Sequence, residues 1–152
     1  MKVYRIAGKK YAGDISGKGA ALYGGRWNKK GTAVLYTGES IEIALLEILV
    51  HTPPMLVPDL SLVTLEIPGN SITELKPEEL PPNWFDYPAP GILAEIAQQW
   101  IEQNQNLALK VPSSIVHSSY NYILNCQHKD YNNNVKILEI KDFHFDRRLK
   151  KC

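Results

Sequence analysis

Apolar and polar residues alternate in short segments along the chain, and two longer segments carry apolar residues at helical spacing. The alternation predicts strands over residues 3–7, 33–38 and 60–68, and apolar side chains on both faces of the third predict a central position in a sheet. The helical spacing predicts helices over residues 40–51 and 91–103. Ser40 is suited to cap the first of these helices, and Pro53 to end it.

The remaining segments are less regular. Residues 70–90 are rich in proline and acidic side chains and predict an irregular excursion with one helical turn at 77–80. A strand that breaks at Pro112, a polar loop over residues 117–134 and one or two closing strands over residues 135–146 follow. Because strands and helices do not alternate regularly, we expect a single α+β domain over residues 1–152, with a mixed β-sheet flanked by helices.

Glu47 stands in the middle of the predicted helix over residues 40–51, whose apolar side chains cover nearly its whole circumference. Such a helix is expected to be buried, so the carboxylate must reach a pocket or find a partner. Functional sites tolerate the free-energy cost of a buried carboxylate, which favours a functional role. The alternative is a buried ion pair with Arg26 or Arg5 that only stabilises the fold.

The charge is distributed unevenly, although the net charge is only +1. Residues 1–31 contain eight Lys and Arg against one Asp, residues 32–110 contain eleven Asp and Glu against two Lys, and residues 111–152 contain seven basic and four acidic groups. Seven of the ten glycines also lie in the first block. A basic, glycine-rich segment is suited to anion binding, because backbone N–H groups can approach a phosphate there. The alternative is a solvated loop.

Three further side chains are candidates for a site. Arg26 follows two glycines in a predicted turn, and its planar guanidinium suits a diphosphate or a carboxylate, although a salt bridge would also explain it. Tyr36 shares a strand face with Val34, where an aromatic ring can be either core or pocket wall. Ser113 follows the strand break, so its hydroxyl either points into a cleft or caps a turn, and no G-x-S-x-G motif surrounds it.

Several classes of site and location are disfavoured. The four histidines form no metal-binding motif, so no metal is predicted, and Cys126 and Cys152 cannot form a disulfide framework. No apolar run approaches the ~18 residues of a membrane span, and the N-terminus does not resemble a signal peptide, so we expect a cytoplasmic protein. A pI of about 7.7 without interleaved aromatics opposes direct nucleic-acid binding. Asn121 and Asn125 are expected to pin the predicted polar loop.

Five segments, in this order and spacing, resemble the RES-domain family of bacterial toxins from type II toxin–antitoxin pairs. They are VYRI, GGRWN, VLYTGES with ALLEILVH, VPSSIV with NYILN and His128, and FHFDRRL. The family is named for its arginine, glutamate and serine, which fall here on Arg26, Glu47 and Ser113, and Tyr36 matches a further pocket residue.

The resemblance implies a fold similar to that of the ADP-ribosyltransferases and cleavage of the nicotinamide–ribose bond of NAD, by hydrolysis or phosphorolysis. It implies an Xre-like helix-turn-helix antitoxin that blocks the pocket, and it allows a homodimer. Arg26 would clamp the diphosphate, Glu47 would stabilise charge at the ribose, Tyr36 would border the nicotinamide, and Ser113 would bind the amide or ribose. Two alternatives remain open: an ADP-ribosyltransferase that modifies a cellular protein, and a toxin directed at RNA.

Overall fold

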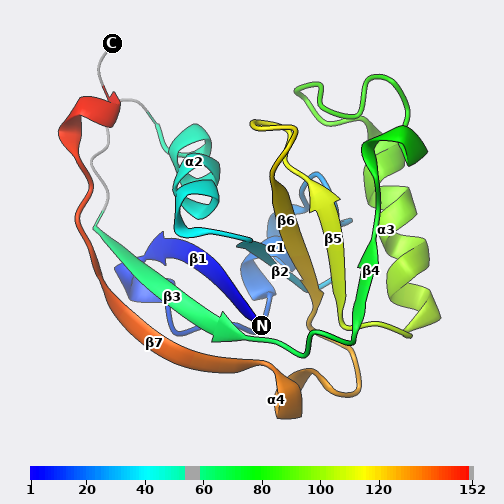
Figure 1. The fold of residues 1–152 in the computed structure, drawn as a ribbon, viewed down its shortest axis with the longest axis horizontal. Helices are drawn as coiled ribbons and strands as arrows, with labels where there is room; N and C mark the ends of the chain where they lie inside the picture. The colour runs from blue at the N-terminus through cyan, green and yellow to red at the C-terminus, as the bar shows by residue number, and fades with distance from the viewer. Residues whose placement is uncertain (54–58, 151–152) are drawn as a thin grey trace.

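The computed structural model describes residues 1–53 and 59–150, so Cys152 lies outside the described residues. Seven strands form one sheet in the order β4-β5-β6-β2-β1-β3-β7 (Figure 1). β4 and β5 are parallel and the other neighbours are antiparallel, which confirms the predicted α+β fold with a mixed sheet. The strands are β1 (Lys2–Gly8), β2 (Val34–Gly38), β3 (Leu60–Glu66), β4 (Ile72–Glu74), β5 (Ala108–Pro112), β6 (Tyr120–Asn125) and β7 (Lys136–Phe143).

Two long helices cover the sheet, and their bounds agree with the apolar spacing. They are α2 (Ile41–His51) and α3 (Gly91–Gln103), with two short helices, α1 (Lys18–Tyr23) and α4 (Tyr131–Asn134), and the 3-10 turns η1 (Lys9–Tyr11), η2 (Pro77–Glu79) and η3 (Arg147–Lys150). The Ser40 hydroxyl accepts a hydrogen bond of 3.2 Å from the N–H of Ile43, which confirms the predicted N-cap. The single turn expected at residues 77–80 is η2.

The sheet consists of two halves that meet at one narrow contact. The pairing of β1 with β2 is confined to Tyr4 and Gly38, whereas β2 pairs with β6 along its full length. Directly opposed residues in antiparallel strands point to the same face. The registers Tyr4–Gly38 and Tyr36–Ile123 therefore place α2, which packs over β1 and β3, on the same face as α3, which packs over β5 and β6.

The core has three apolar clusters that follow from this arrangement. One lies beneath α3 and includes Trp27, a second lies beneath α2, and the third fills the opposite face of the sheet, where Tyr131 of α4 packs. β3 is paired on both sides and largely buried, as the apolar residues on both of its faces predict, but it lies next to the edge strand and not at the centre of the sheet. β7 and β4 are the two edge strands, and the side chains of β7 are mostly exposed.

Two sequence-based expectations are wrong. The predicted polar loop over residues 117–134 contains β6, which pairs on both sides and whose last four residues are buried. The predicted burial of α2 is also wrong, because only Ile43 and Ala44 of that helix are buried and Val50 is 58% exposed. α2 packs against the sheet with one side only. The apolar residues around its circumference are therefore not all buried.

Candidate active site

Glu47 extends from the middle of α2 toward the start of β6 and the end of β5. Its Oε1 accepts a hydrogen bond of 2.8 Å from Asn121 Nδ2 and one of 3.3 Å from Ser113 Oγ. Within the described parts of the chain, Oε2 accepts no hydrogen bond. The carboxylate is therefore held at one oxygen by two donors, and its second oxygen remains available to a ligand.

Ser113 is the buried member of this group, with 0% of its surface exposed. Its hydroxyl oxygen accepts hydrogen bonds from the N–H groups of Ile115 (3.1 Å) and Val116 (3.2 Å), which leaves its proton to be donated to Glu47. The turn that follows β5 thus fixes the hydroxyl. This geometry supports positioning of Glu47 by Ser113 better than direct contact with a ligand.

Arg26 reaches the segment between η2 and α3. Its Nη1 donates to the carbonyl of Trp84 (2.8 Å) and its Nη2 to the carbonyl of Asp86 (3.0 Å). Burial lowers the pKa of Arg26, and the negative charge of Glu47 opposes that lowering. Arg26 and Glu47 form no direct ion pair among residues 1–53 and 59–150. The guanidinium and the carboxylate therefore attract each other without neutralising each other by contact.

Tyr36 and Asn28 organise the turn that carries Arg26. The Tyr36 hydroxyl donates to Asn28 Oδ1 (2.6 Å) and accepts from the N–H of Trp27 (3.0 Å). Asn28 Nδ2 donates to the carbonyls of Ala20 (2.8 Å) and Thr32 (3.1 Å), so one buried amide ties both ends of the turn. Burial raises the pKa of Tyr36 to about 12, so its phenol remains a hydrogen-bond donor at neutral pH.

A cavity of about 220 Å³ opens where β1 and β2 diverge. Its lining includes Arg5, Tyr11, Asp14, Lys18 and Tyr36. Most of these residues belong to the basic segment over residues 1–31. Arg5 donates one hydrogen bond, to the carbonyl of Ala12 (3.1 Å), and burial lowers its pKa. Asp14 interacts with both Arg5 and Lys18, so the charged side chains of the lining leave one excess positive charge.

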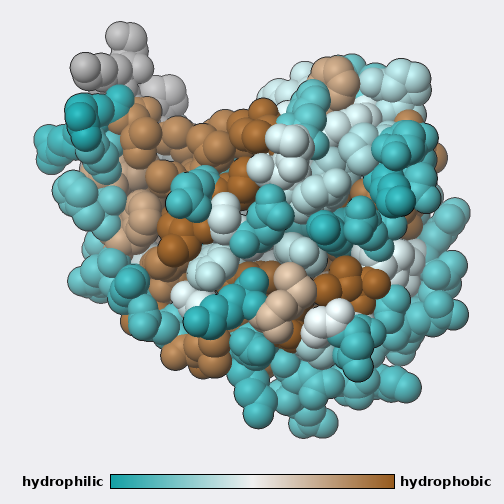
Figure 2. Space-filling view, viewed as in Figure 1, coloured by the Kyte–Doolittle hydropathy of each residue, from teal (hydrophilic) through white to brown (hydrophobic). Residues whose placement is uncertain are grey.

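Figure 2 shows that the molecule is hollowed between α2 and the loops at the ends of β5 and η2. The wall toward α2 is apolar, and the opposite wall is formed by more polar residues. Glu47 approaches from α2, whereas Ser113 and the carbonyls held by Arg26 belong to the facing loops. Glu47 thus approaches the hollow from α2, and the loops that Ser113 and Arg26 fix form its opposite wall.

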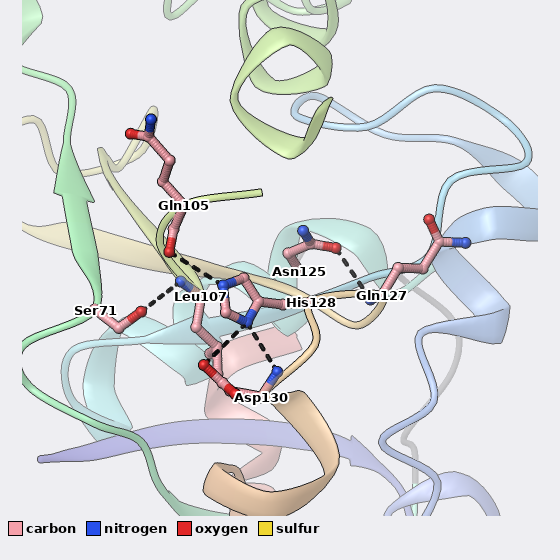
Figure 3. A network of polar contacts seen from close by, with 7 residues as sticks. All are labelled: Ser71, Gln105, Leu107, Asn125, Gln127, His128 and Asp130. Carbon is pink, nitrogen blue, oxygen red and sulfur yellow. Dashed lines mark hydrogen bonds and ion pairs between the residues drawn. The ribbon is translucent and has the colours of Figure 1, made fainter. Parts of the chain in front are cut away.

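His128 belongs to a separate network at the far end of β6 (Figure 3). The N–H of Asp130 donates to its Nδ1 (3.1 Å), so Nε2 carries the proton and donates to the carbonyl of Gln105 (3.2 Å). Asn125 accepts from the N–H of Gln127 (3.0 Å) in the same network. His128 is therefore a structural residue that ties β6 to the segment before β5.

The structure brings the four predicted residues into one region through partners that the sequence did not identify. Asn121 was expected only to pin a loop, yet it donates to Glu47. Asn28 joins Tyr36 to the Arg26 turn. Arg5 was considered only as an ion-pair partner of Glu47, and it lines the cavity instead. An amide in a predicted loop gives no signal of such a role, because its partner is distant in sequence.

Gly25 offers a direct test of how tightly this turn is packed. A Cβ atom at this position would lie 2.7 Å from the Tyr36 hydroxyl oxygen and 3.0 Å from Asn28 Oδ1. We expect Gly25→Ala to lower the free energy of unfolding by about 1–3 kcal/mol, measured by urea denaturation. Gly19→Ala is the control, because no heavy atom of the described residues lies within 4 Å of its added Cβ and alanine favours a helix. Equal stability of the two variants would contradict the packing described.

The described parts of the chain contain no group of three or more His, Cys, Asp or Glu side chains arranged to hold a metal ion. Among the same residues, no helix combines the length and the apolar character needed to cross a bilayer.

Comparison with known proteins assigns the family. The model of the RES domain matches residues 2–146. A protein of Yersinia enterocolitica named Toxin Res is 38% identical over 99% of this chain and 100% of its own length. A Sphingobium protein named Prs ADP-ribosylating toxin is 32% identical over 91% of this chain and 88% of its own length. The crystal structure of the M. tuberculosis MbcT–MbcA toxin–antitoxin complex is similar in fold, with a TM-score of 0.73 and 17% identity over 93% of this chain and 83% of the matched one. Because the RES model spans nearly the whole sequence and these relatives match over most of their length, the chain belongs to the RES domain family.

Proposed function

We propose that this protein is the toxin of a toxin–antitoxin pair and that it cleaves the nicotinamide–ribose bond of NAD. The names of its relatives support the toxin role, since one is Toxin Res and another an ADP-ribosylating toxin. The observation that carries the chemistry is the Glu47 carboxylate, fixed at Oε1 by Asn121 and Ser113 with Oε2 free.

Cleavage of an N-glycosidic bond builds positive charge on the ribose ring. A carboxylate beside the ribose stabilises that charge, or holds a ribose hydroxyl as the bond breaks. The nicotinamide leaves as a neutral ring with the bonding electron pair. An oxygen of water bonds to the ribose carbon and releases a proton to solvent, or an ionised oxygen of phosphate bonds there with no proton released. Oε2 of Glu47 is the atom we assign to the ribose. Arg26 supplies the positive charge that a diphosphate requires.

Tyr36 borders this region, and in our proposal its ring forms part of the nicotinamide wall while its hydroxyl holds the Arg26 turn. Ser113 acts through Glu47. NAD is thus the proposed substrate, and no step requires a metal. The proposed reaction takes place in the cytoplasm, where the substrate is available.

A second candidate is transfer of ADP-ribose to a protein, favoured by the name of the Sphingobium relative. Purified protein is incubated with NAD labelled in the adenylate, with and without cell lysate. Free ADP-ribose or its phosphate ester in both samples supports cleavage, whereas label on protein only in the lysate supports transfer. Unchanged NAD in both samples would contradict both reactions.

The partner we propose is an Xre-like helix-turn-helix antitoxin that covers the hollow. The fold neighbour was solved as a toxin–antitoxin complex, which supports an antitoxin as the partner. Co-expression with the product of the neighbouring gene should abolish NAD loss and give a stable complex. The homodimer remains a prediction, and light scattering of the purified chain would test it.

A further inference from the structure

Three aromatic rings meet between the two loops that border the hollow. Trp84 and Phe85 lie in the η2–α3 loop (residues 80–90), and His117 lies in the β5–β6 loop (residues 113–119). The Phe85 and His117 ring centroids are 4.7 Å apart, and Trp84 lies 5.0 Å from His117 and 5.5 Å from Phe85. Trp84 is only 6% exposed, whereas Phe85 is 44% exposed and His117 is also exposed. A buried tryptophan thus supports two rings that face solvent.

Residues of the candidate active site form hydrogen bonds to both loops that carry these rings. Arg26 donates to the carbonyls of Trp84 and Asp86, the residues on either side of Phe85. His117 follows the turn in which the Ser113 hydroxyl accepts backbone hydrogen bonds and donates to Glu47. The site residues therefore fix the backbone that presents the two exposed rings.

A pair of exposed rings held in this way is suited to bind a flat aromatic group. Their orientation is set before binding, so little side-chain entropy is lost, and every nucleobase offers a π-face for stacking. Aliphatic side chains in place of these rings would bury the same area of a ligand, but they would not favour a stacked orientation. The exposed rings of Phe85 and His117 are therefore suited to stack on a nucleobase.

We propose that Phe85 and His117 form a stacking subsite for the adenine base of the dinucleotide. The inference rests on the proposed function, because it places the nicotinamide riboside at Glu47 and the adenylate half toward the η2–α3 loop. Arg26 then lies between the two ends, where the diphosphate passes. Phe85 and His117 act in binding the adenine base, not in bond cleavage.

The test separates the two halves of NAD. Calorimetry measures the dissociation constants of AMP and of nicotinamide mononucleotide for the wild type, Phe85→Ala and Ile140→Ala. Ile140 is the matched control, because it is 44% exposed on the edge strand β7. We expect Phe85→Ala to weaken AMP binding about tenfold, by loss of one stacking contact, and to leave nicotinamide mononucleotide binding unchanged. Phe85→Trp should restore AMP binding, and Ile140→Ala should resemble the wild type.

Turnover provides the second readout. Phe85→Ala should raise KM for NAD by a similar factor with kcat within about twofold of the wild type, since a subsite remote from the broken bond contributes uniform binding. Equal weakening of both ligands, no weakening of AMP, or no AMP binding by the wild type would overturn the inference. If the wild type binds AMP through Phe85 but does not cleave NAD, the proposed function fails and the subsite stands.

Discussion

Replacement of Glu47 by glutamine is expected to lower the rate of NAD cleavage by about 10² to 10⁴ while the protein remains folded. The glutamine carbonyl can still accept from Asn121 and Ser113, so the local hydrogen bonds survive. The free carboxylate oxygen becomes an NH₂ group, which carries no negative charge and cannot accept a hydrogen bond. The loss should appear in kcat for purified protein with NAD, with thermal unfolding within a few degrees of the wild type.

The matched control is Glu42→Gln, an exposed acidic residue in the first turn of the same helix. Its removal weakens a favourable helix-dipole contact by only about 0.3–1 kcal/mol and should leave turnover unchanged. A Glu47→Gln variant that cleaves NAD within tenfold of the wild type would refute the proposed role of the carboxylate. A loss of activity accompanied by unfolding would instead show that Glu47 mainly stabilises the fold.

Replacement of Arg26 by alanine is expected to abolish NAD depletion in cells and to lower kcat/KM by about 10² or more in vitro. The change removes the positive charge facing Glu47 and both hydrogen bonds to the η2–α3 loop. The variant is therefore expected both to lose the fixed position of the η2–α3 loop and to bind the diphosphate of NAD less tightly. NAD is measured in extracts after induction of the wild type and of the variant at equal protein levels.

Arg26→Lys separates charge from geometry. Lysine keeps the positive charge, but a single ammonium group cannot reproduce the planar fork that contacts two carbonyls, so intermediate activity is expected. Arg147→Ala, an exposed arginine in η3, should deplete NAD as the wild type does. NAD depletion by Arg26→Ala equal to that of the wild type would exclude Arg26 from the site.

The regular elements are well predicted where local chemistry decides them. The α3 bounds, the Ser40 cap and the strands flanking the glycine-rich segment are confirmed, because spacing and caps act within a few residues. β6 was missed because Tyr120 and Asn121 at its start and the polar residues after it resemble a loop. Its polar groups are satisfied by partners elsewhere in the fold, including Glu47 for Asn121.

The sequence alone provided the candidates for the site: a glutamate within an apolar helix, an arginine after two glycines, a tyrosine on a strand and a serine at a strand break. Only the tertiary structure decided which of these groups meet and how each is held. Glu47 finds donors 66 and 74 positions away, and Arg26 finds carbonyls 58 and 60 positions away. These contacts depend on the register of β2, β6 and β5 and on the placement of α2 over the neighbouring strands β1 and β3. Local sequence sets propensity and side-chain chemistry, whereas strand pairing sets distances between residues that no local pattern relates.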